Sequence, residues 1–352
     1  MHVITARNVN GAYRSGLRFI VQDGEKEETP NGAVLRASTS VATVFRHPQE
    51  RVLMSPQRNA NPFFHLFEAL WMLSGQQDVM MLRQFADESV VVHSAFGHRW
   101  RNWPSPEPYG NAVNSFDQLN FVIRALRKNP SDRRVVVGMW DPRRDLNENC
   151  EVPENLTIKV GIAHGKLNMI AFNRSSDVIQ GCYGANAVHL SMLQEYLAAC
   201  INVAVGTLTQ ISTDYHVYLD RPYFLSEYFP LVDEHLTIHE PYADMMVYPL
   251  VHAPDVFDEE LAAFMSFIAD DSLYRADRIA IVQAFRNKFL WAVALPMYLA
   301  HIYIRQRDYP NALQVLITEH EHYLHPLPID WICACAAWIE RRMREAGIKV
   351  VK

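Results

Sequence analysis

Hydrophobic and polar positions follow both helical and extended periods over the first 250 residues of the chain. Residues 63–73 form an almost unbroken apolar run after Pro62, and a Ser-Gly pair ends it, which predicts a buried helix. Residues 114–128 place apolar side chains at helical spacing on one face, which predicts an amphipathic helix. Residues 187–201 are mostly apolar, so we expect a long central helix there.

Extended patterns lie between these predicted helices. Residues 156–162 and 167–173 alternate between apolar and polar positions around His164-Gly165, which is typical of a β-hairpin. Strand character is also present in the segments 41–45, 135–140 and 207–218.

The last hundred residues have a different pattern, because nearly all of them favour helix. Four helices are expected, at residues 259–268, 279–305, 312–323 and 331–345. A short stretch that contains prolines, residues 248–254, precedes them. We therefore predict a first domain over residues 1–250 and an all-α C-terminal extension over residues 251–352.

Composition narrows the class of protein. The chain has 352 residues, of which 49% are hydrophobic, and a formal net charge of −6, which argues against broad nucleic-acid binding. No apolar run approaches the roughly 20 residues of a membrane span, and the N-terminus lacks the pattern of a signal peptide. The odd number of cysteines, with no metal-ligand spacing, favours reduced thiols in a cytoplasmic protein without a metal.

Several arginines lie beside small polar residues at the ends of predicted strands. Arg36 precedes the segment 37–40 (ASTS), Arg133 and Arg134 open a strand, and Arg174 follows one. The planar guanidinium group forms paired, charge-assisted hydrogen bonds to phosphate. Each arginine alone would be typical of a solvated surface, but together they favour a site for a small phosphate.

Six sequence blocks carry a specific resemblance. In order along the chain they are residues 67–71 (FEALW), 96–100 (FGHRW), 132–137 (DRRVVV), 173–177 (NRSSD), 181–187 (GCYGANA) and 214–218 (DYHVY). Over residues 33–220 the chain thus resembles the thymidylate synthase and deoxynucleotide hydroxymethylase family. The block 181–187 is most similar to the phage-type branch, which includes the hydroxymethylases.

The resemblance implies an α/β fold with a large mixed sheet and surrounding helices, packed back to back in a homodimer. It also implies transfer of a one-carbon unit from 5,10-methylenetetrahydrofolate to C5 of a pyrimidine nucleotide 5′-monophosphate, either dUMP or dCMP. Arg36, Arg174 and Ser175 match the family's phosphate-binding residues. Arg133 and Arg134 match the pair that reaches the phosphate in the neighbouring subunit.

Other site residues follow from the same resemblance. Asn186 matches the asparagine that contacts O4 and N3 of uracil, although an amide can also turn to fit cytosine. His216 and Tyr218 match the groups that bind the sugar 3′-hydroxyl, and Asp177 matches the aspartate that orders the folate pterin. Glu68 matches the glutamate that organises water and proton transfer. A carboxylate inside the apolar segment 63–73 also favours a functional role on its own.

The nucleophile position departs from the family pattern. A cysteine normally follows the proline that corresponds to Pro153, and its thiolate adds to C6 of the base. Here Glu154 occupies that position, and Cys150 lies four residues earlier. Three alternatives follow: Cys150 is the nucleophile after a local rearrangement, Glu154 serves as acid, base or nucleophile in a diverged enzyme, or the protein binds a nucleotide without turnover.

Two further departures concern folate. Residues 85–89 (FADES) replace the tryptophan-containing stretch that usually lines the folate pocket, and the helical extension replaces the short tail that closes over the cofactor. The residues therefore imply folate use less directly than nucleotide binding.

Overall fold

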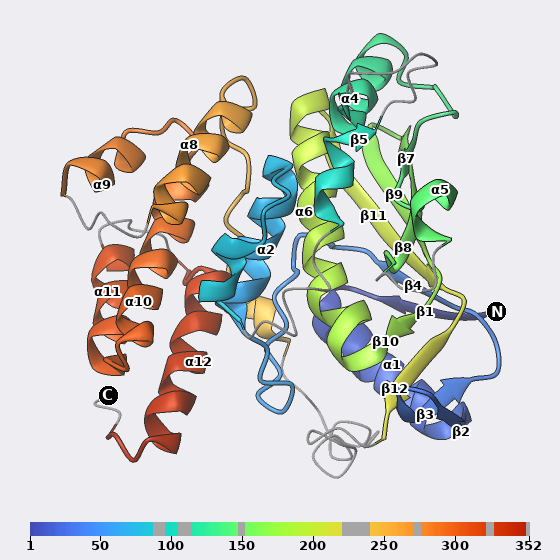
Figure 1. Cartoon of the computed structure of the whole chain (residues 1–352), viewed down its shortest axis with the longest axis horizontal. Helices are drawn as coiled ribbons and strands as arrows, with labels where there is room; N and C mark the ends of the chain where they lie inside the picture. Colours follow the sequence, from blue (N-terminus) through green and yellow to red (C-terminus); the bar gives the residue numbers. More distant parts are fainter. Residues whose placement is uncertain are drawn as a thin grey trace.

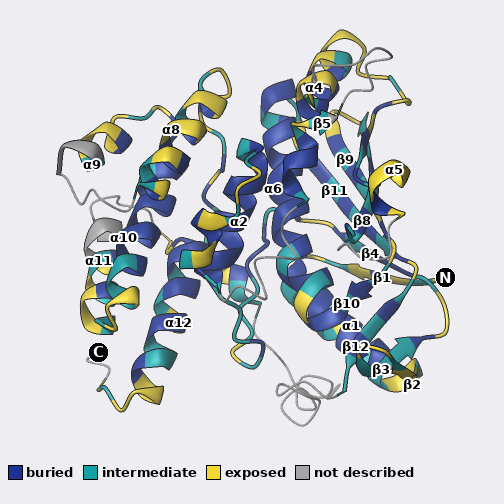
Figure 2. Ribbon diagram, viewed as in Figure 1, coloured by how far each residue is buried: buried dark blue, intermediate teal, exposed yellow. Residues whose placement is uncertain are grey.

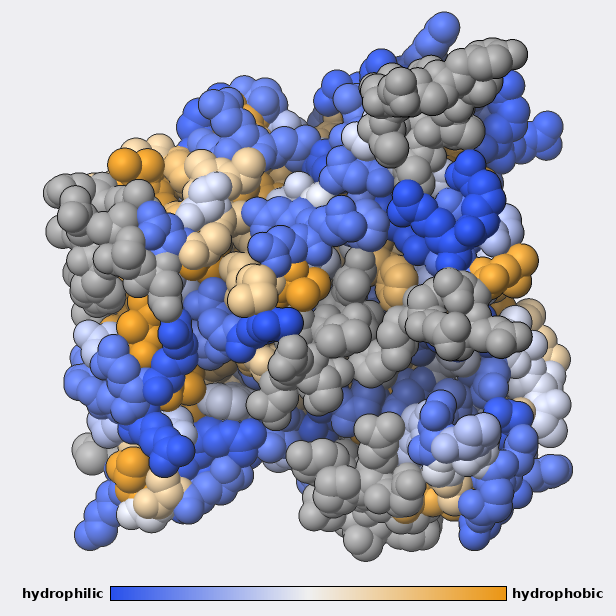
Figure 3. Space-filling model, in the orientation of Figure 1, coloured by the Kyte–Doolittle hydropathy of each residue, from blue (hydrophilic) through white to orange (hydrophobic). Residues whose placement is uncertain are grey.

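The computed structural model describes residues 1–86, 96–104, 115–146, 152–219, 240–270, 276–321 and 327–349. Figure 1 shows sheets with their covering helices on one side of the molecule and the helices of the C-terminal extension on the other. Hydrophilic side chains cover much of the face that Figure 3 shows, with smaller hydrophobic patches over the extension. In the described part of the chain, no helix is both long enough and apolar enough to cross a bilayer.

A six-stranded mixed sheet forms the centre of the first part, which confirms the predicted α/β fold. Its strands, in spatial order, are β1 (His2–Ala6), β4 (Val41–Phe45), β11 (Ala204–Ser212), β9 (Lys166–Asn173), β8 (Asn155–Ala163) and β7 (Val136–Gly138). Strands β1 and β4 pair in parallel, as do β9 and β11, whereas the other three pairs are antiparallel. The hairpin around His164-Gly165 is confirmed, and both of these residues have positive φ.

A second sheet lies beside the first. Its order is β10 (Ser176–Asp177), β12 (Tyr215–Tyr218), β3 (Gly32–Ala37) and β2 (Gly24–Thr29). A two-stranded pair, β5 (Trp103–Pro104) and β6 (Ser115–Phe116), completes the described strands. The segment 207–218, predicted as one strand, is two strands in different sheets, because the chain turns at residues 213–214.

The predicted central helix is α6 (Asn186–Ile201), and nearly all of its side chains are buried. It packs against α2 (Pro62–Ser74), α4 (Gln118–Lys128) and the strands β9 and β11 (Figure 2). Helix α2 is also confirmed; Asn61 caps its first turn, and Gly75 ends it with a φ of 72°. Helix α4 starts later than predicted, because Asp117 caps it and residues 115–116 are extended.

Helix α1 (Val9–Asp23) was not predicted from the sequence. The Asn8 side chain caps it by accepting hydrogen bonds from the backbone N–H groups of residues 10 and 11. Gly16 allows the helix to approach the sheet closely, because a Cβ atom there would lie 2.3 Å from the Tyr215 hydroxyl.

The extension contains α8 (Phe257–Ala269), α9 (Ala276–Gln283), α10 (Leu295–Arg305), α11 (Tyr309–Glu321) and α12 (Asp330–Glu345). The helix predicted over residues 279–305 is interrupted at residues 284–287 and continues through a π-helix, Leu290–Ala294. The buried Asn287 explains the interruption, because its side chain bonds to the backbone of Leu250 and His252 rather than to helical neighbours. Helix α2 contacts α8, α10 and α12, and one hydrophobic core spans both parts of the chain. The division at residue 250 stays a prediction.

A buried polar cluster connects helix α12 of the extension to residues 52 and 242 by hydrogen bonds. The Tyr242 hydroxyl donates to Asp330 Oδ2 at 2.9 Å and accepts from the backbone N–H of Val52 at 3.1 Å. Asp330 Oδ1 accepts from the Trp331 N–H at 2.8 Å. Burial raises the pKa of Asp330 to about 7, so this carboxyl keeps its proton in the folded protein under mildly acidic conditions.

The protonated Asp330 predicts a pH-dependent contribution to stability. Because the folded-state pKa lies above the unfolded value, this contribution is complete below about pH 4 and is lost as pH rises through about 7. An asparagine side chain at this position would mimic the protonated acid, so Asp330→Asn should gain on the order of 2–4 kcal/mol relative to wild type between pH 5 and 8. Urea unfolding at several pH values measures the difference. Parallel pH profiles for the two proteins would contradict the assignment.

Candidate functional site

Glu154 and Asn186 come together although 32 residues separate them in the sequence. Glu154 immediately precedes β8, and Asn186 is the first residue of α6. The Asn186 Nδ2 atom donates a hydrogen bond to Glu154 Oε2 at 2.6 Å. The carboxyl group of Glu154 also faces Gly181, where a Cβ atom would lie only 3.2 Å from Oε1. Glu154 is thus directed toward the residues that lead into α6.

The environment of Glu154 changes its acidity. Burial raises the pKa of this carboxyl to about 7, the nearby Asp177 acts in the same direction, and the hydrogen bond from Asn186 opposes both. A group with this pKa can take up and release a proton at neutral pH. Cys182 lies in the same region, but burial and the two carboxylates raise the pKa of its thiol, so it is a poor source of thiolate.

The small sheet aligns three predicted site residues in one row. Asp177 of β10 pairs with His216 of β12, and His216 pairs with Arg36 of β3. Residues in register on adjacent strands point to the same face, so the three side chains share one surface. His216 is further oriented by a hydrogen bond between Nδ1 and Asp214 Oδ1 at 2.9 Å, and its ring contacts that of Tyr218 edge to face.

Arg36 is partly exposed and forms ion pairs with two carboxylates. Its guanidinium group lies 2.8 Å from Glu27 and 3.1 Å from Asp214. Such half-exposed pairs contribute little to stability, roughly 0–1 kcal/mol, so an anionic ligand can compete for the arginine. The Nε atom of Arg36 is buried and has no hydrogen-bond partner among the described residues.

Arg174 braces the segment before Glu154. Its guanidinium donates to the backbone carbonyls of Pro153 and Val152 at 3.2 and 3.3 Å, and to the Ser175 hydroxyl at 3.1 Å. The backbone N–H of Arg174 also donates to the Glu154 carbonyl at 2.9 Å. Because Arg174 is exposed beyond these contacts, it can meet a ligand while it fixes the position of Glu154.

Asp177 also caps a helix. Its Oδ1 atom accepts from the backbone N–H groups of Ile179 and Gln180 and so caps the π-helix η4 (Val178–Ala185). Gly184 breaks the helical geometry just before α6 begins. Both ends of the segment 174–186 therefore contact Glu154: the Arg174 N–H bonds to its backbone carbonyl, and Asn186 bonds to its carboxyl group.

Glu68 lies deep in the protein on α2. It accepts a hydrogen bond from, or donates one to, Nε2 of His189 on α6 at 2.8 Å. His189 is one helical turn from Asn186, which links Glu68 to the site. His65, one turn earlier on α2, is also buried, and its pKa is lowered mainly by burial and then by the Arg58 charge. His65 and His189 were not predicted as site residues from the sequence, although a histidine in an apolar helix requires a polar partner.

The predicted pair Arg133 and Arg134 lies elsewhere. Arg133 and Arg134 are exposed and precede β7 at the edge of the large sheet; Arg134 pairs with Asp132 at 2.9 Å. Cys150 lies outside the described residues. Among those described, no group of three His, Cys, Asp or Glu side chains is arranged to hold a metal ion.

Comparisons with known proteins identify the family of the chain. The sequence model of the thymidylate synthase family matches residues 11–244. A deoxyuridylate hydroxymethyltransferase of Pseudomonas phage M6 is 36% identical, and the alignment covers 97% of this chain and 95% of the relative. Another, of Bacillus phage SP01, is 31% identical over 62% of this chain and 60% of its own length. A thymidylate synthase of Corynebacterium aurimucosum is 30% identical over 45% of this chain and 60% of its own length.

These matches support a transferase that moves a one-carbon unit to C5 of a pyrimidine deoxynucleotide. The family's enzymes use methylenetetrahydrofolate as the donor. Together with the fold, the sequence matches establish that the chain belongs to the thymidylate synthase family.

Proposed function

We propose that this enzyme replaces the C5 hydrogen of dUMP by a hydroxymethyl group. The one-carbon unit comes from 5,10-methylenetetrahydrofolate, and water supplies the hydroxyl, so the products are 5-hydroxymethyl-dUMP and tetrahydrofolate. The deoxyuridylate hydroxymethyltransferase of phage M6 aligns with almost the whole chain, including the region beyond residue 244 where the family match ends. Arg36, Arg174 and Ser175 would hold the phosphate, and His216 and Tyr218 the sugar.

The hydrogen bond from Asn186 to Glu154 fixes the orientation of the Asn186 amide, and this orientation favours uracil over cytosine. With one N–H of Nδ2 directed at Glu154, the second N–H and Oδ1 are left to face the base. This donor and acceptor complement O4 and N3–H of uracil. Cytosine requires the reversed amide, which would turn Oδ1 toward the ionised carboxylate of Glu154. Glu154 thus acts as a positioning residue for base recognition.

Glu154 also stands where the family places its nucleophile, beside the residue that contacts the base. A carboxylate adds poorly to C6, so we assign it proton transfer at the pyrimidine, which a pKa of about 7 suits. Glu68, paired with His189, is the second proton-transfer group. Asp177 would orient the folate pterin with the carboxylate oxygen that does not cap η4.

Glu154→Gln tests this assignment. Wild-type enzyme with methylenetetrahydrofolate should release tritium from C5-labelled dUMP and form the hydroxymethyl product. Because glutamine cannot exchange a proton, the variant should release tritium at least about 100-fold more slowly. The measured dissociation constant for dUMP should stay within about threefold, since the phosphate and sugar contacts remain.

Cys150→Ala is the matched control, because it removes the other candidate for the nucleophile position. Unchanged tritium release in Cys150→Ala supports a role for Glu154. Abolished release in Cys150→Ala with normal release in Glu154→Gln would assign the chemistry to the thiol. Absence of release from wild-type enzyme with either dUMP or dCMP would contradict C5 transfer itself.

The raised pKa of Glu154 predicts the pH dependence of kcat/KM. If the ionised carboxylate acts as the base, kcat/KM should rise about tenfold between pH 6 and 8 and level off above that range. The rise should be absent from the residual activity of Glu154→Gln. Initial rates at low dUMP concentration across this range provide the measurement, and the same rise in both proteins would contradict the assignment.

We further propose that the enzyme is a homodimer whose subunits pack through the six-stranded sheet. Side chains of β8, β9 and β11 alternate between buried positions and half-buried or exposed ones, and the second set includes Phe172, which is 38% exposed. The second face of the sheet is thus mostly half-buried and carries apolar side chains, and such a face favours a partner. Arg133 and Arg134, at the edge of this sheet, would then complete the phosphate site of the neighbouring subunit.

Mixed dimers test this shared site. An Arg133→Ala/Arg134→Ala double variant and Arg174→Ala should each be weakly active as homodimers. When the two chains are co-expressed with different tags and the hybrid is purified, one of its sites carries all the defects and the other carries none. The hybrid should therefore exceed both parents in C5 transfer. A hybrid no more active than its parents would show that Arg133 and Arg134 serve their own subunit.

A further inference from the structure

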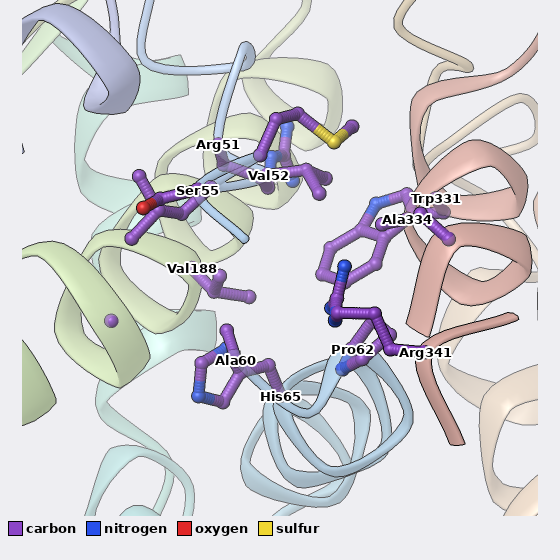
Figure 4. Close-up of a pocket in the computed structure, with 14 residues that line it drawn as sticks. Arg51, Val52, Ser55, Ala60, Pro62, His65, Val188, Trp331, Ala334 and Arg341 are labelled. Carbon is purple, nitrogen blue, oxygen red and sulfur yellow. The ribbon is translucent and has the colours of Figure 1, made fainter. Parts of the chain in front are cut away.

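A pocket lies between the first part of the chain and the last helix of the extension. From α12 come Trp331 and Arg341, and from the entrance to α6 come Gly184 and Val188 (Figure 4). The remaining wall is the segment that leads into α2, with His65 at its inner end. Gly184 is two residues from Asn186, and His65 is one turn from Glu68. The pocket therefore lies close to Asn186 and Glu68, two residues of the proposed nucleotide site.

The inner walls of the pocket suit a flat, uncharged group. The Trp331 indole and Pro62 line one side of the cavity, and the imidazole of His65 lies across from Trp331 (Figure 4). His65 is neutral at physiological pH, because burial and the Arg58 charge lower its pKa well below the ordinary value. Aromatic and apolar surfaces with a few polar groups are typical of sites that bind heteroaromatic ligands.

Arg341 differs from the other arginines near it. Arg51, which also lines the pocket, pairs with Glu195, and the exposed Arg344 pairs with Glu340. Arg341 points into the pocket, donates from Nε to Asn59 Oδ1 at 3.3 Å, and forms no ion pair with any described residue (Figure 4). A half-buried guanidinium without a counter-charge favours an anion, and a carboxylate matches its fork of donors.

We propose that helix α12 supplies the outer wall of the donor site, where Arg341 binds the glutamate carboxylate of the folate and Trp331 packs against its aromatic part. This inference rests on the proposed function, because it assigns the donor of that reaction to a place. The residues of α12 lie outside the stretch 11–244 that the family match covers. The helical extension would thus enclose the donor in this enzyme.

Equilibrium binding tests the role of Arg341 without turnover. Protein saturated with dUMP is titrated calorimetrically with folate and, separately, with pteroate, which has the same rings but no glutamate. Arg341→Ala should bind folate about tenfold more weakly than wild type, and Arg341→Glu more weakly still. Pteroate should bind wild type and Arg341→Ala equally, and the affinity for dUMP should not change.

Arg344→Ala is the control, because Arg344 is on the same helix but is exposed and does not line the pocket. It should bind folate like wild type, and thermal unfolding should show that all variants are folded. Equal folate affinity in wild type and Arg341→Glu would overturn the inference while leaving the proposed reaction intact. The two proposals can also fail separately in the other direction. If Arg341→Ala loses folate affinity as expected but wild-type protein releases no tritium from dUMP, the binding pocket is supported and the proposed reaction is contradicted.

Discussion

Helix α6 is buried on almost every side, so each of its polar side chains must find a partner within the protein. A buried donor or acceptor without a partner costs about 1–3 kcal/mol, and a buried charge costs more. Partners in the surrounding layers meet most of this requirement: Asn186 with Glu154, His189 with Glu68, the Gln194 Nε2 group with the carbonyls of Leu167 and Thr207, Glu195 with Arg51, and Tyr196 with Asp258. The buried Oε1 atom of Gln194 has no hydrogen-bond partner among the described residues. These pairs fix the positions of the sheet, α2 and the extension relative to one helix.

The same pairs connect the site to the extension. Glu195 accepts from the backbone N–H of Leu250 as well as pairing with Arg51, which lines the pocket beside α12. Arg51 adjoins Val52, whose N–H bonds to Tyr242 and through it to Asp330. Glu195 and Arg51 therefore link α6 to the wall of the pocket beside α12.

Sequence patterns predicted the elements that depend on local periodicity, such as α2 and the β8–β9 hairpin. They did not predict α1, because its apolar face is interrupted by Gly11 and Gly16, and the need for Gly16 arises from distant tyrosines. The resemblance proposed residues for the site but could not predict their arrangement. The row from Asp177 through His216 to Arg36 depends on strand register between segments far apart in the chain. The pocket at α12 has no sequence motif, so only the folded chain brings Arg341 to His65.

In the proposed site, Glu154 occupies the position of the family's nucleophile, and its surroundings determine what chemistry it can perform. A thiolate in this position acts by attacking the base. A carboxylate with an ordinary pKa would stay ionised at neutral pH and could not donate a proton, so its pKa must be raised. Burial beside Asp177 moves its pKa to about 7, and Asn186 limits that shift by donating to the ionised form. In the proposed site, the amide that faces the base is thus also the group that adjusts the acidity of Glu154. Base recognition and proton transfer would then be coupled through one hydrogen bond, and a nucleotide that engages the other edge of Asn186 would act on both.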